Sequence, residues 1–145
     1  PKRGPETAWA HGVSLVVAYS DARGQALDPR SLAQGTEVHI EVSVSNSATQ
    51  SREDMALSYQ APAGWELGND RIDAAVDYID QRDDRLHAYF SLAPGATRKF
   101  NVSAQTAYAG RYYLPMTTVE AMYDATVQAR TTGRWIEVVV PGEAG

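Results

Sequence analysis

The chain has 145 residues, 43% of them hydrophobic, and a formal charge of -5 at pH 7. This length is typical of a single domain with one hydrophobic core. Because no segment concentrates lysine or arginine, the charge pattern excludes a binder of phosphate backbones, and we expect no nucleic-acid partner. The absence of cysteine excludes disulfides, thiolate metal sites and a cysteine nucleophile.

Apolar and polar residues alternate with a period of two along most of the chain, which predicts half-buried strands. We expect at least six such strands. Their core-facing residues are, in chain order, Val13, Leu15, Val17 and Tyr19; Val38, Ile40, Val42 and Val44; Met55, Leu57 and Tyr59; Leu86, Ala88, Phe90 and Leu92; Phe100, Val102 and Ala104; and Ile136, Val138 and Val140.

Turn signals separate these strands, and no segment has a convincing helical period. We expect residues 124–130 to form an extended loop. Many short strands with frequent turns predict an all-β fold, an antiparallel β-sandwich of about seven strands. We expect residues 12–140 to form this domain, residues 1–11 to be a linker from a preceding domain, and residues 141–145 to be a flexible tail. No apolar run approaches the roughly 20 residues of a membrane span.

The densest cluster of charge lies between residues 77 and 87. Asp80, Asp83 and Asp84 would suit a calcium site or a pair of catalytic carboxylates. The spacing fits a tight connection between two strands better, with Asp83 and Asp84 in the turn and Arg82 and Arg85 offsetting their charge. The segment lacks the glycine and terminal glutamate of a calcium-binding loop.

The three histidines do not occur at metal-ligand spacing, and a zinc site usually needs three or four convergent ligands. We therefore expect His11, His39 and His87 to be structural or surface residues, and we expect no metal site and no cofactor. The sequence contains no nucleophile elbow, phosphate-binding loop or dinucleotide fingerprint. Nothing specific in the sequence indicates a catalytic residue, so we predict that the chain is not an enzyme.

Tyrosine and tryptophan outnumber phenylalanine, a bias typical of interfaces. Tyr112 and Tyr113 are neighbours in a segment that Pro115 excludes from a regular central strand. One interpretation is that these rings cap the core, as a tyrosine corner does. Because neighbouring side chains on a strand point to opposite faces, both rings cannot be core residues.

Several segments together carry a resemblance to a known family. The sequence from about Gly12 to Val140 resembles the C-terminal macroglobulin-like domain of bacterial alpha-2-macroglobulins. The most specific segments are Arg82-Asp-Asp-Arg85 and Glu120-Ala-Met-Tyr-Asp124. Weaker ones are Leu27–Gly35, Ala61–Leu67 and Gly110–Pro115. The resemblance implies a macroglobulin-like sandwich, similar to a fibronectin type III domain.

The resemblance also implies a function. Such a parent protein is periplasmic, often a lipoprotein at the inner membrane, and entraps proteases. Cleavage of its bait region exposes a Cys-x-Glu-Gln thioester, which belongs to another domain and is absent here. The expected partners are other domains of the same parent chain, target proteases through the parent, and periplasmic accessory proteins. In members that carry the thioester, this closing domain packs on the thioester domain; other members lack the thioester and keep the domain.

Within the resemblance, Met122 and Tyr123 are the expected thioester-shielding contacts. A flexible methionine beside an amphipathic tyrosine can fill an apolar pocket while the hydroxyl finds a partner. We add Glu120 and Tyr113 to this interdomain set, and Arg82, Asp83, Asp84 and Arg85 as a second interface. The alternative for Tyr123 is burial in its own domain, in phase with Val119 and Ala121.

Two other functions compete with this interpretation of the sequence. One is an adhesin-like or carbohydrate-binding module, in which an exposed Trp9, Trp65 or Trp135 stacks on sugar rings. Trp65 follows a turn and is the best candidate, whereas Trp135 lies in an apolar terminal strand. The other is a hydrolase that uses Asp80, Asp83 or Asp84.

Overall fold

A computed structural model describes residues 9–68, 78–81 and 84–141, with the backbone alone for 78–81. Every regular element in this part of the chain is a β-strand. The strands are β1 (Trp9–His11), β2 (Ser14–Ser20), β3 (Ser31–Ala33), β4 (Glu37–Ser45), β5 (Arg52–Gln60), β6 (Trp65–Leu67), β7 (Tyr78–Gln81), β8 (Arg85–Leu92), β9 (Thr97–Thr106), β10 (Gly110–Leu114), β11 (Thr118–Ala121), β12 (Asp124–Arg130) and β13 (Arg134–Val139).

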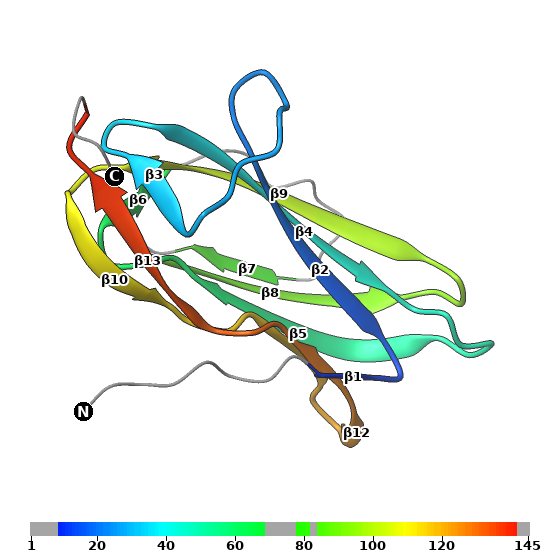
Figure 1. Cartoon of the computed structure of the whole chain (residues 1–145). Helices are drawn as coiled ribbons and strands as arrows, with labels where there is room; N and C mark the ends of the chain where they lie inside the picture. The colour runs from blue at the N-terminus through cyan, green and yellow to red at the C-terminus, as the bar shows by residue number, and fades with distance from the viewer. Residues whose placement is uncertain (1–8, 69–77, 82–83, 142–145) are drawn as a thin grey trace.

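The strands form three sheets that make a two-layered sandwich (Figure 1). One layer is a four-stranded sheet in the order β2-β4-β9-β6. The other consists of a six-stranded sheet, β1-β12-β11-β5-β8-β7, and a three-stranded sheet, β10-β13-β3. The chain passes between these last two sheets from β10 into β11 and from β12 into β13. Among the described strands, all pairings are antiparallel except that of β13 with β3.

The core lies between the two layers. Val38, Ile40, Val42 and Val44 all face it from β4 and are fully buried. Phe90 of β8 and Phe100 of β9 meet across the core with ring centroids 5.0 Å apart. Burial of apolar surface on this scale is the main term that stabilises a domain of this size.

The sequence-based prediction of an all-β sandwich is confirmed, and so are the inward phases of β4, β5, β8 and β9. The expected count of about seven strands is too low, because the described residues form thirteen. Val140 is a further correction: β13 ends at Val139, and Val140 is exposed.

Residues 124–130 were expected to form a loop, and this prediction is wrong. They form β12, which pairs with β11 on one side and with β1 on the other. The segment has only a weak local preference for a strand, but hydrogen bonding to two neighbouring strands makes it one. The partner β1 lies at residues 9–11, inside the segment that we expected to be a linker.

No helix able to cross a membrane occurs among the described residues.

Candidate functional site

Met122 and Tyr123 form the tip of the hairpin between β11 and β12. The strands close tightly, because Ala121 on one side pairs with Asp124 on the other. Figure 1 shows this hairpin projecting from one end of the sandwich. Met122 is 47% exposed and Tyr123 is 85% exposed, the largest value among the large hydrophobic residues whose exposure the structure describes. Burial of Tyr123 in its own domain, the alternative interpretation of the sequence, is therefore wrong, since the alternation of β11 ends at Ala121.

A hydrogen bond fixes the tip to the neighbouring strand. The backbone N–H of Met122 donates to the carbonyl oxygen of Asp54 at 2.9 Å. Asp54 has a φ of 54°, the one left-handed value among the described non-glycine residues. It lies where the pairing of β5 with β8 shifts register between Arg52 and Met55. Such bulges often redirect a strand beside a functional site.

Asp124 orders the other side of the tip. Its Oδ1 accepts hydrogen bonds from the backbone N–H of Thr126 at 3.0 Å and from the Thr126 hydroxyl at 2.6 Å. These bonds, the hydroxyl bond first, lower the pKa of the Asp124 carboxyl. The tip is thus held from both strands, while its two side chains remain exposed.

Arg52 completes the base of the tip. It lines a hollow of about 280 Å³ together with Tyr123 and Asp124. Its Nε atom is buried and has no hydrogen-bond partner among the residues that the structure describes. The side chains of Met122 and Tyr123 thus project beside a hollow that charged and apolar residues line together.

The other members of the expected contact set are separated by the fold. Glu120 is exposed on β11, next to the tip. Tyr113 is on β10 in the three-stranded sheet, where its ring packs edge-on against Trp135 with centroids 5.4 Å apart. The hairpin therefore brings Glu120, Met122 and Tyr123 together, and Tyr113 belongs to a different surface.

The tyrosine pair of β10 divides as alternation requires. Tyr112 packs against the core, and its hydroxyl donates to the carbonyls of Ala109 at 3.1 Å and Tyr108 at 3.2 Å. This is the capping role expected of one ring of the pair. β10 ends at Leu114, directly before Pro115, as the missing N–H of proline requires.

The acidic cluster is only partly described. Arg82 and Asp83 lie outside the described residues, and so does the side chain of Asp80. Asp84 and Arg85 form a surface ion pair, with Arg85 Nε donating to Asp84 Oδ1 at 3.1 Å. This bond lowers the pKa of Asp84. The backbone of Asp84 also accepts a hydrogen bond from Ala61, so this residue helps to close the connection before β8.

The histidines show no arrangement for a metal. His39 Nε2 lies 2.6 Å from Glu37 Oε2 on the surface, and His11 Nδ1 contacts the carbonyl oxygen of Thr126. Across the described residues, no group of three or more His, Cys, Asp or Glu side chains is placed to hold a metal ion.

The positions of the tryptophans argue against the carbohydrate-binding alternative. Trp65, its best candidate, is 2% exposed and packs edge-on against Tyr19 at 5.8 Å, so it cannot stack on a sugar. Trp9 and Trp135 are partly exposed, but arginines lie over both rings: Arg130 over Trp9 at 5.8 Å and Arg111 over Trp135 at 5.4 Å. Sequence reasoning placed Trp65 at the surface because it follows a turn; the sheet that covers it is not visible in local sequence.

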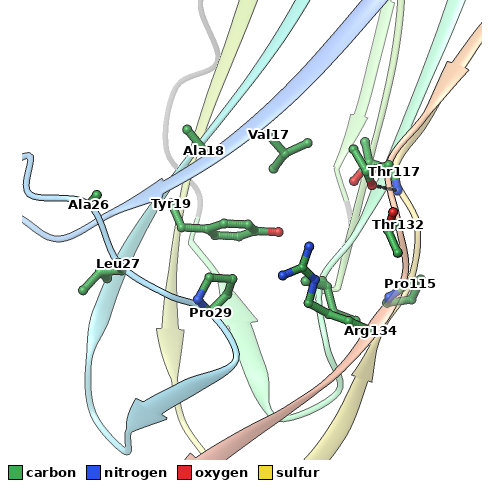
Figure 2. A pocket seen from close by; sticks show the side chains of 12 residues that line it. Val17, Ala18, Tyr19, Ala26, Leu27, Pro29, Pro115, Thr117, Thr132 and Arg134 are labelled. Atoms are coloured by element: carbon green, nitrogen blue, oxygen red, sulfur yellow. Dashed lines mark hydrogen bonds between the residues drawn. The ribbon is translucent and has the colours of Figure 1, made fainter. Parts of the chain in front are cut away.

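A pocket of about 400 Å³ lies at the seam between the two layers (Figure 2). Its apolar wall includes Tyr19, Leu27 and Pro115, and threonines and Arg134 supply its polar rim. Sequence analysis did not identify this pocket, because its walls come from four separate segments. Figure 2 shows the Tyr19 ring directed toward the Arg134 guanidinium.

Comparison with known proteins gives consistent matches. Residues 12–125 match the family described as "Bacterial Alpha-2-macroglobulin MG10 domain". An alpha-2-macroglobulin homolog of Yersinia pestis is 27% identical over 169 aligned positions, covering 97% of this chain and 8% of the relative. These matches confirm the resemblance inferred from sequence. The chain spans less than a tenth of the length of this curated relative.

Solved structures share the fold. Native alpha-2-macroglobulin of Escherichia coli, solved by cryo-electron microscopy, has a TM-score of 0.85 and 21% identity over 97% of this chain and 10% of its own. A mutant alpha-2-macroglobulin of Salmonella has a TM-score of 0.83 and 23% identity, covering 94% of this chain and 10% of its own. In both, a domain of this fold is one part of a much longer polypeptide.

Proposed function

Because the chain belongs to the bacterial alpha-2-macroglobulin MG10 domain family, we propose that it is a non-catalytic module of a protease-trapping parent protein. It packs on neighbouring domains of that parent, and the parent, not this module alone, captures proteases. The length relationship supports this role, since the chain covers 8% of its Yersinia pestis relative. The periplasm is the proposed compartment, with the parent anchored at the inner membrane, and periplasmic accessory proteins are proposed as further partners.

The proposed contact is the tip formed by Met122 and Tyr123. Where the parent carries a thioester, these side chains cover it and exclude water and small nucleophiles. A thioester survives in water only when it is shielded, and an apolar finger that ends in a hydroxyl can both displace water and make one directed hydrogen bond. Glu120, exposed beside the tip, forms part of the same contact.

The observation that carries this proposal is the 85% exposure of Tyr123 on a hairpin whose backbone is fixed by Asp54 and Asp124. A large aromatic side chain held outside its own core, on a backbone that is itself ordered, is typical of a protein contact site. Holding the tip in advance also lowers the entropy lost when the contact forms.

Thiol titration of the full-length parent, before and after methylamine treatment, tests the proposal. Aminolysis of a shielded thioester releases a cysteine thiol, and the Met122→Ala/Tyr123→Ala variant should release it faster, even without methylamine. Tyr108→Ala is the matched control, since Tyr108 is 58% exposed on a different loop. Equal rates in the tip variant and the control would reject the shielding role. A folded parent that releases no thiol would instead assign the tip to a noncovalent interdomain contact.

A further inference from the structure

Strand β2 is an unusual edge strand. It is the outer strand of the four-stranded sheet and, at 7 residues, the longest edge strand among those described. Native proteins protect such edges with charged residues, proline or bulges. The sequence Ser14-Leu-Val-Val-Ala-Tyr-Ser20 contains neither charge nor proline, and its pairing with β4 is continuous. Val16 in its middle is 59% exposed.

The backbone of β2 offers hydrogen-bonding groups away from β4. The carbonyl of Tyr19 accepts a bond from the N–H of Leu27 at 2.9 Å, so the polar groups of Tyr19 point to the outer side of the sheet. Residues two apart on a strand point the same way. The N–H and C=O groups of Leu15 and Val17 therefore also point outward, and no loop hydrogen bond within the described part of the chain reaches them.

The seam pocket opens beside this edge. Val17, Ala18 and Tyr19 of β2 form one wall of its roughly 400 Å³, and Leu114 and Pro115 form the opposite wall. This volume lies in the range that accepts a bulky side chain together with flanking backbone. A strand that pairs with β2 would direct alternate side chains into the pocket, which is how strand addition combines affinity with specificity.

Charge at the rim defines the occupant further. Arg134 lines the pocket and forms no ion pair with a described residue. A guanidinium in this position recognises a carboxylate, for which its paired N–H groups are well matched. The outward backbone groups, the apolar walls and the cation together fit an extended segment with an apolar residue and a nearby Asp or Glu.

We propose that the outer edge of β2 binds an extended segment of the parent protein from outside these 145 residues. The segment pairs with the backbone of Leu15 and Val17, inserts an apolar side chain between Tyr19 and Pro115, and places a carboxylate on Arg134. The rest of a longer parent chain can provide such a segment, because about nine-tenths of each of these two alpha-2-macroglobulins lies outside the region that this chain covers. The inference rests on the proposed role as a module of a longer chain, but it does not depend on the tip.

Hydrogen exchange measured by mass spectrometry tests the proposal on two samples, this chain alone and the full-length parent. The peptide spanning residues 13–20 should exchange at least about tenfold more slowly in the parent, because pairing with an added segment protects the outward N–H groups of β2 from local opening. A tenfold slowing corresponds to about 1.4 kcal/mol of added stability against opening. Residues 37–45 of β4 serve as the internal control, since β4 is already paired on both sides and should exchange alike in both samples.

Two variants sharpen the test. Val17→Pro removes an outward N–H, which an edge strand tolerates, so this chain should still fold while the parent loses the added protection. Arg134→Gln should reduce the protection by several-fold without abolishing it.

Equal exchange of residues 13–20 in the two samples overturns the proposal. So does protection of this chain alone that rises with its concentration and accompanies a dimer in sedimentation, which would make a second copy the occupant. Tip variants that alter thiol release should leave the hydrogen exchange of residues 13–20 unchanged. The shielding role of the tip and the pairing at β2 can therefore be rejected independently of each other.

Discussion

The N–H of Met122 donates a 2.9 Å hydrogen bond to the carbonyl of Asp54, and Asp54 is the residue of the described chain that adopts a left-handed backbone without being glycine. The two residues are far apart in sequence but adjacent in the sheet, where Ala121 pairs with Met55. A bulged position on β5 therefore sets the position of the hairpin tip. This relationship links local strain to an exposed contact surface.

Replacing Asp54 with valine should destabilise the domain by about 1–3 kcal/mol, because a β-branched residue is strongly disfavoured at a φ of 54°. Denaturant unfolding measures this loss. Glu53→Val is the matched control, because Glu53 is an exposed neighbour on the same strand. Its substitution should change the free energy of unfolding by less than about 0.5 kcal/mol relative to the unmodified chain. Equal losses for the two variants would show that the left-handed conformation is not the cause.

The tip should be dispensable for folding. Tyr123→Ala removes a side chain that is 85% exposed and should change the free energy of unfolding by less than about 0.5 kcal/mol. Tyr59→Ala removes a fully buried ring and should cost about 3–5 kcal/mol. A large loss for Tyr123→Ala in thermal or denaturant unfolding would assign the tip a structural role within this domain.

Alkaline pH should destabilise the domain through a buried phenol pair. The hydroxyls of Tyr19 and Tyr59 are 3.2 Å apart, and burial raises the pKa of both above the ordinary value of 10.0. The folded state thus holds these protons more tightly than the unfolded chain does. Stability is therefore complete below pH 10 and falls as the pH rises through 10 toward the folded pKa values.

Tyr59→Phe checks the origin of this pH dependence. It should cost about 0.5–1.5 kcal/mol at pH 7 through the lost hydrogen bond. Above pH 10 its stability should fall less steeply, by up to about 1.4 kcal/mol per pH unit, because one fewer proton is released on unfolding. Tyr108→Phe, at an exposed position, should keep the original pH dependence. Urea unfolding between pH 7 and 11 distinguishes these outcomes.

Gly64 has a packing role that no other residue can fill. A Cβ atom at this position would overlap the ring of Tyr112, although the backbone of Gly64 is not left-handed. Gly64→Ala should therefore destabilise the domain by about 1–3 kcal/mol through overpacking. In a double-mutant cycle with Tyr112→Ala, the combined loss should be smaller than the sum of the two single losses. Additive losses would contradict a direct clash.

The carboxyl of Asp28 should titrate at unusually low pH. Hydrogen bonds from the Arg30 side chain and then from its backbone lower the pKa of Asp28 from 3.8 to about 2. The stabilising contribution of this pair is present above pH 3.8 and is lost as the pH falls toward 2. In carboxyl NMR titrations, Arg30→Gln should raise the Asp28 pKa and leave that of Asp21 unchanged, because Asp21 is held by the backbone of Gln25 and Arg23. An unshifted Asp28 would reject the Arg30 contribution.

Alternation alone located the principal strands. The side chains of a strand alternate between the two faces of a sheet, so the alternation of apolar and polar residues along a half-buried strand shows which face is buried. The core-facing residues of β4 follow this rule: Val38, Ile40, Val42 and Val44. The same reasoning failed where a strand ends, as at Val140. It failed again at residues 124–130, where pairing with β1 and β11 makes a strand of a segment whose residues do not require one.

Periodicity is a local property, so it predicted the fold class without a structure, and the matching segments, which keep their order along the chain, indicated the family. Which candidate residues are exposed, and which lie on the same surface, became evident from the three-dimensional arrangement. It buries Trp65 beneath Tyr19, separates Tyr113 from Tyr123, and leaves the Tyr123 ring exposed. The exposure of a residue depends on which sheet covers it. That covering is set by contacts between segments distant in sequence, such as the bond from Met122 to Asp54.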